Sequence, residues 1–143
     1  MGSGIVPASN LPPPASFRYA RRAGVLAAIQ IVAAFNAKDI TKILDMYAES
    51  SVFMPPNEPI IRGKDALRQF YENLVTRQGA SDLKMEISEV AGHGTLAYQS
   101  GTYEMKRGAG RDRGKYLFVI RKMANGWKFH YTMWNSDLAP SDN

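Results

Sequence analysis

The stretch SVFMPPNEPIIRG, Ser51 to Gly63, decides how this chain is organised. It begins as an apolar strand, which Pro55, Pro56 and Pro59 then interrupt. Proline lacks a backbone N–H and is excluded from the interior of a sheet, so the strand must end and the chain must turn. We therefore expect a short, proline-containing strand pair that leads through Arg62–Gly63 into a helix.

Three helices are predicted around this break. Residues 17–37 have almost no polar side chains after Arg22, which predicts an enclosed helix. Residues 39–50 and 64–79 each carry a single apolar stripe, with Asp39 as a cap of the first and Gly79 at the end of the second. The stripes are Ile40, Ile43, Leu44 and Tyr47, and then Leu67, Phe70, Tyr71 and Leu74.

The remainder of the chain reads as four strands separated by short turns. The strand-like runs are DLKMEISEV, TLAYQSGTYEMK, KYLFVIRKM and GWKFHYTMWNSD. We interpret the basic run Lys106–Lys115 between two of them as a solvated hairpin loop, because it contains three glycines. Helices followed by strands are typical of an α+β domain, here three N-terminal helices packed on a curved four-stranded antiparallel sheet plus the proline-containing pair.

Domain bounds follow from composition. With 143 residues, the chain is long enough for one domain. Residues 1–16 are rich in Pro, Gly and Ser and predict a flexible leader. We expect the domain over residues 17–139 and a short tail over 140–143.

The run YLFVI, Tyr116 to Ile120, is apolar at every position. Successive residues of a strand point to opposite faces, so neither face of the sheet is expected to be freely solvated there. The helices cover one face, and a second copy of the chain is the simplest cover for the other. We therefore expect a homodimer through the sheet.

Composition and charge exclude several other functions. The chain has no cysteine, so disulfides, thiolate metal sites and a cysteine nucleophile are excluded. A net charge of +5 is modest, and no nucleic-acid reading motif accompanies it, so we expect no nucleic-acid partner. The pair Arg21–Arg22 before an apolar run is similar to an export signal, but Gln30 interrupts that run. We expect a cytoplasmic protein without a membrane partner, with export as the alternative.

The order of these elements resembles the NTF2-like superfamily of cone-shaped α+β domains. Within it, LDMYAESSVFMPPNEPIIRGKDALRQFYENL and the closing GWKFHYTMWNSDL resemble the SnoaL-like and DUF4440 group, which is similar to ketosteroid isomerases. The resemblance covers residues 23–137. It implies a largely apolar pocket for a small molecule between the helices and the concave sheet face, and dimerisation through the sheet.

The resemblance also implies catalytic positions that this chain does not fill. Ketosteroid isomerases abstract a proton with an Asp before the first proline of the break, and stabilise the enolate with a Tyr of the first helix and a protonated Asp from the sheet. Laid along this sequence, the position of the proton-abstracting Asp is Met54, and the position of the Tyr falls near Ile31 in the first helix. Neither side chain can do that chemistry.

The last strand supplies the remaining candidates for ligand-binding residues and for a catalytic base. Alternation puts Trp127, Phe129, Tyr131, Met133 and Asn135 on one face, which the resemblance suggests is the cavity face. Tyr131 and Asn135 would then orient a ligand. His130 and Asp137 are the candidate bases, although a histidine on the back of the sheet and a solvated strand end are the simpler interpretations.

Three functions remain open on the sequence alone. The first is a binding domain for a small apolar or carbonyl-containing ligand, the second a cofactor-free isomerase, cyclase or dehydratase, and the third a non-catalytic assembly or regulatory module. The sequence contains no nucleotide or zinc signature, so we expect neither a cofactor nor a metal. The predicted pocket residues are Tyr47, Met54, Tyr103, Tyr131, Trp134 and Asn135.

Overall fold

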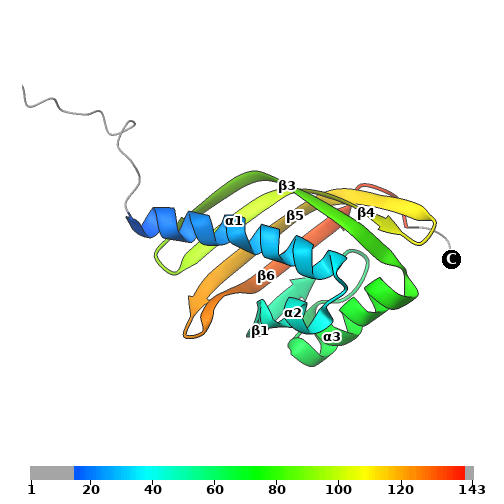
Figure 1. The fold of residues 1–143 in the computed structure, drawn as a ribbon, viewed down its shortest axis with the longest axis horizontal. Helices are drawn as coiled ribbons and strands as arrows, with labels where there is room; N and C mark the ends of the chain where they lie inside the picture. Colours follow the sequence, from blue (N-terminus) through cyan, green and yellow to red (C-terminus); the bar gives the residue numbers. More distant parts are fainter. Residues whose placement is uncertain (1–14, 141–143) are drawn as a thin grey trace, which may run out of the picture.

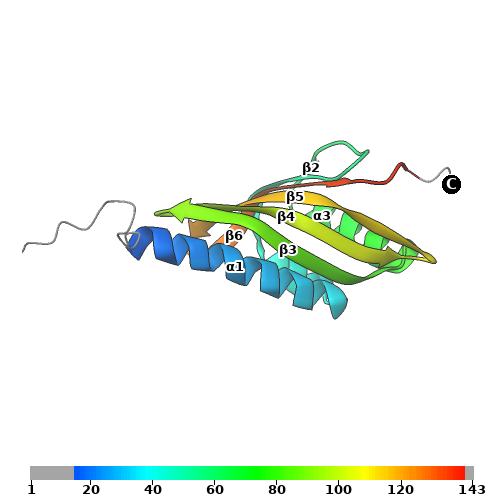
Figure 2. The same cartoon turned by 90° about the horizontal axis from the view of Figure 1, so that it is seen from above.

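The computed structural model describes residues 15–140, and its helices lie on one face of a curved sheet (Figures 1 and 2). Helix α1 (Ala15–Asn36) runs lengthwise across that face, and α2 (Ile40–Asp45) and α3 (Lys64–Glu72) pack beside its C-terminal end. Over the described residues the structure has three α-helices and a separate π-helical segment, so the helix count differs from the three that were predicted. The predicted leader lies outside the described residues, apart from the start of α1 at Ala15.

Helix α2 is shorter than its apolar stripe suggested. The Asp39 carboxylate caps its start and accepts a hydrogen bond from the Lys42 backbone N–H at 3.1 Å, as expected. The helix ends at Asp45, and Tyr47 is the first residue of strand β1. The prediction that Tyr47 continues a helical stripe was therefore wrong, since its side chain is buried from a strand instead.

The sheet has six strands, not a separate sheet of four plus a pair. The strand order is β2-β1-β6-β5-β4-β3. The proline-containing pair, β1 and β2, joins the main sheet because β1 runs parallel to β6. The bounds are β1 Tyr47–Met54, β2 Ile61–Arg62, β3 Ala80–His93, β4 Leu96–Arg107, β5 Gly110–Met123 and β6 Gly126–Ser136.

Helix α3 continues as a π-helical turn over Asn73–Arg77, and Gly79 follows with a φ of +63°. A glycine with positive φ after the last helical residues is the usual way to end a helix, as the sequence predicted.

The basic run Lys106–Lys115 is not a solvated loop. Only residues 108–109 lie between the strands, and the rest extends β4 and β5. Its one acidic residue, Asp112, is 5% exposed on the inner face of β5. The three glycines misled the prediction, because only Gly108 is needed for the turn.

A β-bulge in β6 reverses the expected orientation of its second half. Ile120 of β5 faces Phe129, and the preceding Val119 faces Tyr131, so His130 is an extra residue on β6. One extra residue moves every later side chain to the other face. Phe129 is buried on the inner face, whereas Tyr131 is exposed on the outer face.

In this chain the run YLFVI is buried on one face only, and the expected cover of its other face stays a prediction. Tyr116, Phe118 and Ile120 are buried in the core under the helices, whereas Leu117 is 38% exposed on the outer face. Over residues 15–140 no helix combines the length and apolar character needed to cross a membrane.

Candidate functional site

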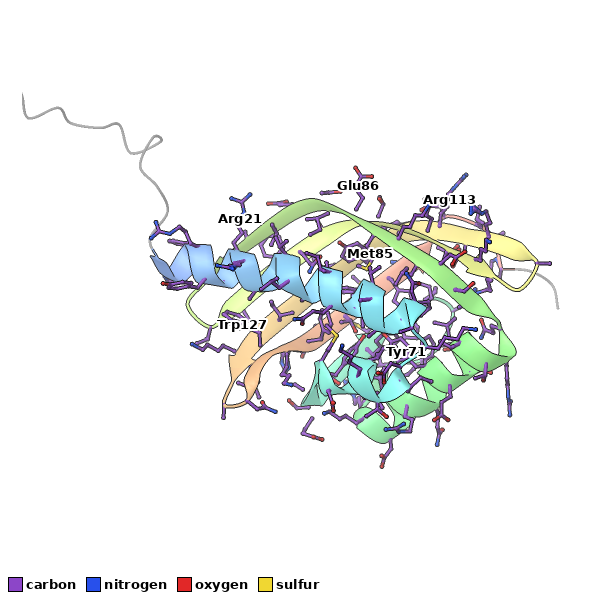
Figure 3. All side chains as sticks on the ribbon, viewed as in Figure 1. Arg21, Tyr71, Met85, Glu86, Arg113 and Trp127 are labelled. Atoms are coloured by element: carbon purple, nitrogen blue, oxygen red, sulfur yellow. The ribbon has the colours of Figure 1, made fainter. Side chains whose placement is uncertain are left out.

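A small apolar cavity lies between the helices and the inner face of the sheet (Figure 3, where Tyr71 of α3 and Met85 of β3 are labelled). Its free volume is about 60 Å³, enough for a few water-sized groups. The cavity is lined by Ile31, Phe35, Tyr47, Phe53, Phe70, Tyr71, Leu74, Leu83, Met85, Tyr103, Met105, Phe118 and Trp134. These side chains include no carboxylate, imidazole or amine.

The first polar feature of the cavity is a pair of tyrosine hydroxyls. The Oη atoms of Tyr47 and Tyr71 are 2.6 Å apart, and both side chains are buried. Burial raises the pKa of Tyr71 to about 12, with a small opposing effect of its hydrogen bond to Tyr47. Burial, and then Tyr71, raise the pKa of Tyr47 further. Both phenols are therefore neutral at physiological pH.

Two neutral phenols share one hydrogen bond but carry two protons. The Thr132 hydroxyl also interacts with Tyr47 and lowers its pKa, as a group that donates to the Tyr47 oxygen would. With Tyr47 donating to Tyr71, the accepting Tyr71 keeps a proton that the pair does not use. The pair can therefore donate one hydrogen bond to a group inside the cavity.

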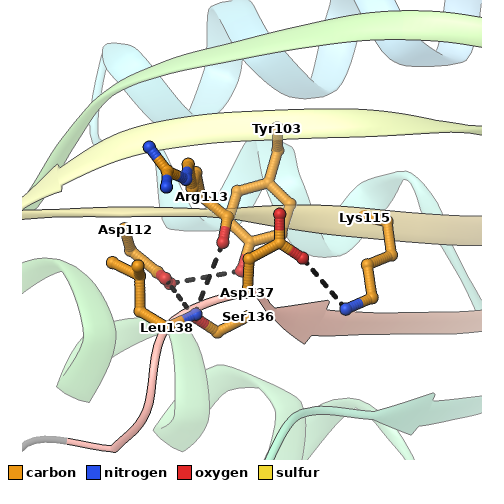
Figure 4. A network of polar contacts seen from close by, with 7 residues as sticks. All are labelled: Tyr103, Asp112, Arg113, Lys115, Ser136, Asp137 and Leu138. Carbon is orange, nitrogen blue, oxygen red and sulfur yellow. Dashed lines mark hydrogen bonds and ion pairs between the residues drawn. The ribbon is translucent and has the colours of Figure 1, made fainter.

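The second polar feature is a buried carboxylate behind Tyr103 (Figure 4). The Tyr103 hydroxyl donates to Asp112 Oδ2 at 3.2 Å, and the Ser136 hydroxyl donates to Asp112 Oδ1 at 2.5 Å. Arg107 Nη2 stands 3.9 Å from Oδ2 and contributes mainly charge. Burial and then the Asp112 charge raise the pKa of Tyr103 well above its ordinary value, so this phenol also stays protonated.

Local sequence explains why Tyr103 reaches this carboxylate. Tyr103 pairs with Gly114 on the neighbouring strand. A Cβ added at Gly114 would lie 2.9 Å from Cε1 of Tyr103 and 1.9 Å from the carbonyl oxygen of Asn135. Glycine at this position lets the Tyr103 ring lie close against β5.

Half of the predicted pocket residues line the cavity. Tyr47, Tyr103 and Trp134 do so. Tyr131 and Asn135 lie on the exposed outer face, which corrects the expected orientation of β6. Their misplacement follows from the bulge at His130.

Met54 also lies outside the cavity lining. It follows Phe53, which lines the cavity, so its side chain leaves β1 on the opposite side. The position that the family resemblance gave to the proton-abstracting Asp therefore does not face the cavity.

The two candidate bases do not reach the cavity either. His130 sits in the bulge with its Nδ1 buried and without a hydrogen-bond partner among the described residues. Burial, and then the Arg121 charge, lower the pKa of His130. Asp137 is exposed at the end of β6, where its Oδ1 accepts from Lys115 Nζ at 3.0 Å.

Two residues of the candidate site were missed at the sequence level. Tyr71 was interpreted only as part of a packing stripe, and Asp112 was assigned to a loop. The period-two pattern Asp112, Gly114, Tyr116, Phe118 is a signal that could have placed Asp112 on the buried face.

A helix-covered, cone-shaped sheet around an apolar cavity defines the class of this protein: an NTF2-like α+β domain. The sequence profile of the SnoaL-like domain matches residues 28–133, and the chain belongs to that family. The SnoaL-like prediction is confirmed, whereas assignment to the DUF4440 group stays a prediction. No curated protein sequence matches the chain.

Solved structures share the fold over nearly their full length. A ketosteroid isomerase-like protein from Erwinia carotovora atroseptica is 26% identical, with a TM-score of 0.73 over 83% of this chain and 97% of its own. An NTF2-like protein of unknown function from Pseudomonas putida is 17% identical, with a TM-score of 0.72 over 86% and 98%. An NTF2-like protein from Streptomyces avermitilis described as a candidate dehydratase is 16% identical, with a TM-score of 0.72 over 85% and 99%.

Proposed function

We propose that this protein binds a small, neutral, largely apolar molecule with a hydrogen-bond acceptor such as a carbonyl oxygen. The Tyr47–Tyr71 pair is the observation that carries the proposal, because it offers one free O–H to a cavity that is otherwise mostly hydrocarbon. A buried hydroxyl without a partner is costly, and a ligand acceptor would supply that partner. An anionic ligand is disfavoured, since the same burial that raises the two pKa values penalises negative charge.

The cavity lining favours binding over proton abstraction. A general base must stand within hydrogen-bond reach of the proton that it removes. None of the side chains that line the cavity is a base, and His130 and Asp137 lie elsewhere.

A cofactor-free isomerase, cyclase or dehydratase remains the second candidate because of one observation. The Asp112 carboxylate is one hydrogen bond behind the cavity wall, at Tyr103. Turnover of a bound carbonyl compound that is lost in Asp112→Asn would favour this candidate over simple binding.

The size of the cavity determines which probes suit the test. Ligand pockets commonly have volumes of about 300–1,000 Å³. The free volume here is about 60 Å³, so a ligand must displace some lining side chains. Compact aryl ketones are appropriate first probes, because their flat rings resemble the aromatic side chains that they would displace.

The test is a titration of acetophenone against ethylbenzene by ligand-detected NMR and calorimetry. We expect acetophenone to bind, and the double variant Tyr47→Phe/Tyr71→Phe to weaken its binding roughly threefold to tenfold while ethylbenzene is unaffected. The double variant is needed because either single substitution leaves one phenol whose O–H is free for the ligand. Tyr98→Phe is the matched control, because its hydroxyl bonds Glu89 on the outer face. Unchanged acetophenone affinity in the double variant, or no binding of any aryl ketone, would contradict the proposal.

A further inference from the structure

The hydrogen bonds of Asp112 determine what Tyr103 can offer to a ligand. A carboxylate only accepts hydrogen bonds, so the single proton of the Tyr103 hydroxyl is committed to Oδ2. Ser136 occupies Oδ1, and Arg107 is beyond hydrogen-bond distance. If the Tyr103 hydroxyl donated to a ligand instead, the buried Asp112 carboxylate would lose one of its hydrogen bonds, which is costly. Tyr103 lines the cavity, and the Ser136 hydroxyl also interacts with its oxygen. The phenol oxygen can therefore offer a lone pair, not a proton, to a further partner.

The Tyr103 oxygen is separate from the tyrosine pair that donates. A series of ring contacts links the two places, from Tyr71 to Phe70 at 5.8 Å, on to Trp134 at 6.4 Å and then to Tyr103 at 5.4 Å between centroids. Two rings of the cavity wall, those of Phe70 and Trp134, thus connect the ring of Tyr71 with the ring of Tyr103.

We propose that the cavity selects ligands that carry a hydroxyl group at the Tyr103 end and an acceptor at the Tyr47–Tyr71 end, a neutral hydroxyketone being the simplest such class. Asp112 is the positioning residue of this selection, because it orients the Tyr103 proton away from the ligand. This inference rests on the proposed binding function and adds the second recognition point. The raised pKa of Tyr103 agrees with it, since a phenol that holds its proton stays a neutral acceptor.

The experiment compares two ligands of nearly equal shape, 4-hydroxyacetophenone and 4-methylacetophenone, by calorimetry on the full chain. Transfer from water favours the methyl compound, so a preference for the hydroxyl compound reports a hydrogen bond made in the cavity. In the wild type we expect 4-hydroxyacetophenone to bind roughly threefold to tenfold more tightly.

Two variants separate the role of Tyr103 from that of Asp112. Tyr103→Phe removes the acceptor, and the preference should invert in favour of 4-methylacetophenone. Asp112→Asn keeps the shape but introduces an amide that can donate to Tyr103 and free its proton, so the preference for the hydroxyl compound should fall while the binding of 4-methylacetophenone is retained. A purely structural role of Asp112 would weaken both ligands equally.

The outcomes distinguish this inference from the proposed function. If both ketones bind and lose affinity in Tyr47→Phe/Tyr71→Phe, but the methyl compound binds as well as the hydroxyl compound in the wild type, the inference is overturned and the proposed function stands. If neither ketone binds, both are overturned. Circular dichroism and thermal melting establish that each variant is folded, and if Tyr103→Phe does not fold, the Asp112→Asn comparison alone decides.

Discussion

Asp112 is a buried acidic residue on β5, whereas its chain neighbours Arg111 and Arg113 are exposed. Its carboxylate is buried and is compensated by the hydroxyls of Tyr103 and Ser136 and by the nearby Arg107. Buried ionised groups are tolerated only with such partners. This cluster therefore contributes to folding as well as to the shape of the cavity.

Asp112→Ala should lower the free energy of unfolding by about 2–3 kcal/mol, because the buried Tyr103 hydroxyl and the partly buried Ser136 hydroxyl lose their acceptor and Arg107 loses its counter-charge. Urea denaturation followed by circular dichroism measures this. Asp137→Ala is the control, since its ion pair with Lys115 is exposed and should contribute less than about 1 kcal/mol. Equal effects of the two substitutions would show that the Asp112 cluster is energetically ordinary.

The lowered pKa of His130 leads us to expect that the stability of the fold depends on pH. Burial, and then Arg121, lower its pKa in the folded state below the ordinary value of 6.5. The unfolded chain then binds a proton more readily, so the contribution of His130 is fully present above pH 6.5 and is lost as the pH falls through the lowered folded pKa.

Denaturation curves between pH 5 and 8 should therefore show a loss of stability on the acid side that His130→Gln reduces. His93→Gln, which changes the other histidine, should leave this dependence in place. An identical acid-side loss in wild type and His130→Gln would assign the effect to other groups.

Strand β5 depends on a glycine for its close contact with both neighbours. A Cβ at Gly114 would overlap the Asn135 carbonyl of β6 and press on the Tyr103 ring of β4. Overpacking of this kind shifts backbone and commonly costs about 1–3 kcal/mol.

Gly114→Ala should therefore destabilise the fold by about 2 kcal/mol or more and also weaken the binding of hydroxyketones, because Tyr103 is displaced. Thermal melting and calorimetry measure the two effects. Gly110→Ala on the same strand is the control, since its nearest neighbour would be the Arg107 carbonyl oxygen at 3.7 Å and no strain is expected. Equal stability of the two variants would contradict the close contact described for Gly114.

The outer face of the sheet carries an apolar patch at the scale of the whole molecule. Tyr98 pairs with Val119, Val119 with Tyr131, and Leu117 with Met133, so these five side chains are neighbours. Leu117, Tyr98, Tyr131 and Met133 are each 37–43% exposed in a single chain. Contiguous apolar side chains of this kind are typical of interaction surfaces.

We propose that a second copy of the chain covers this patch, as the YLFVI run suggested. Light scattering coupled to size exclusion should give a dimer at micromolar concentration, and Leu117→Lys should convert it to a monomer because it buries an unpaired charge. Thr102→Lys, on the outer face of β4 but outside the patch, is the control. A wild-type monomer would refute this arrangement.

Much of the architecture could be predicted from local sequence. The proline break after Met54, the cap at Asp39 and the helix end at Gly79 each act within a few residues, and each was found where expected. The alternating runs likewise predicted β3 to β6, because strand periodicity is a short-range property.

The candidate site was less predictable because it depends on contacts between distant residues. Tyr47 and Tyr71 are 24 positions apart, as are Asp112 and Ser136, so no local pattern reveals either hydrogen bond. The face of the sheet on which each β6 side chain lies could not be predicted either, since the bulge at His130 appears only in the pairing of β6 with β5.

The sequence by itself determined the order of helices and strands, the proline break and the absence of a carboxylate at Met54. Only the tertiary structure decided which side chains meet in the cavity. The physical reason is that backbone preferences act over a few residues, whereas a bulge of one residue and hydrogen bonds between separate elements decide which side chains face each other.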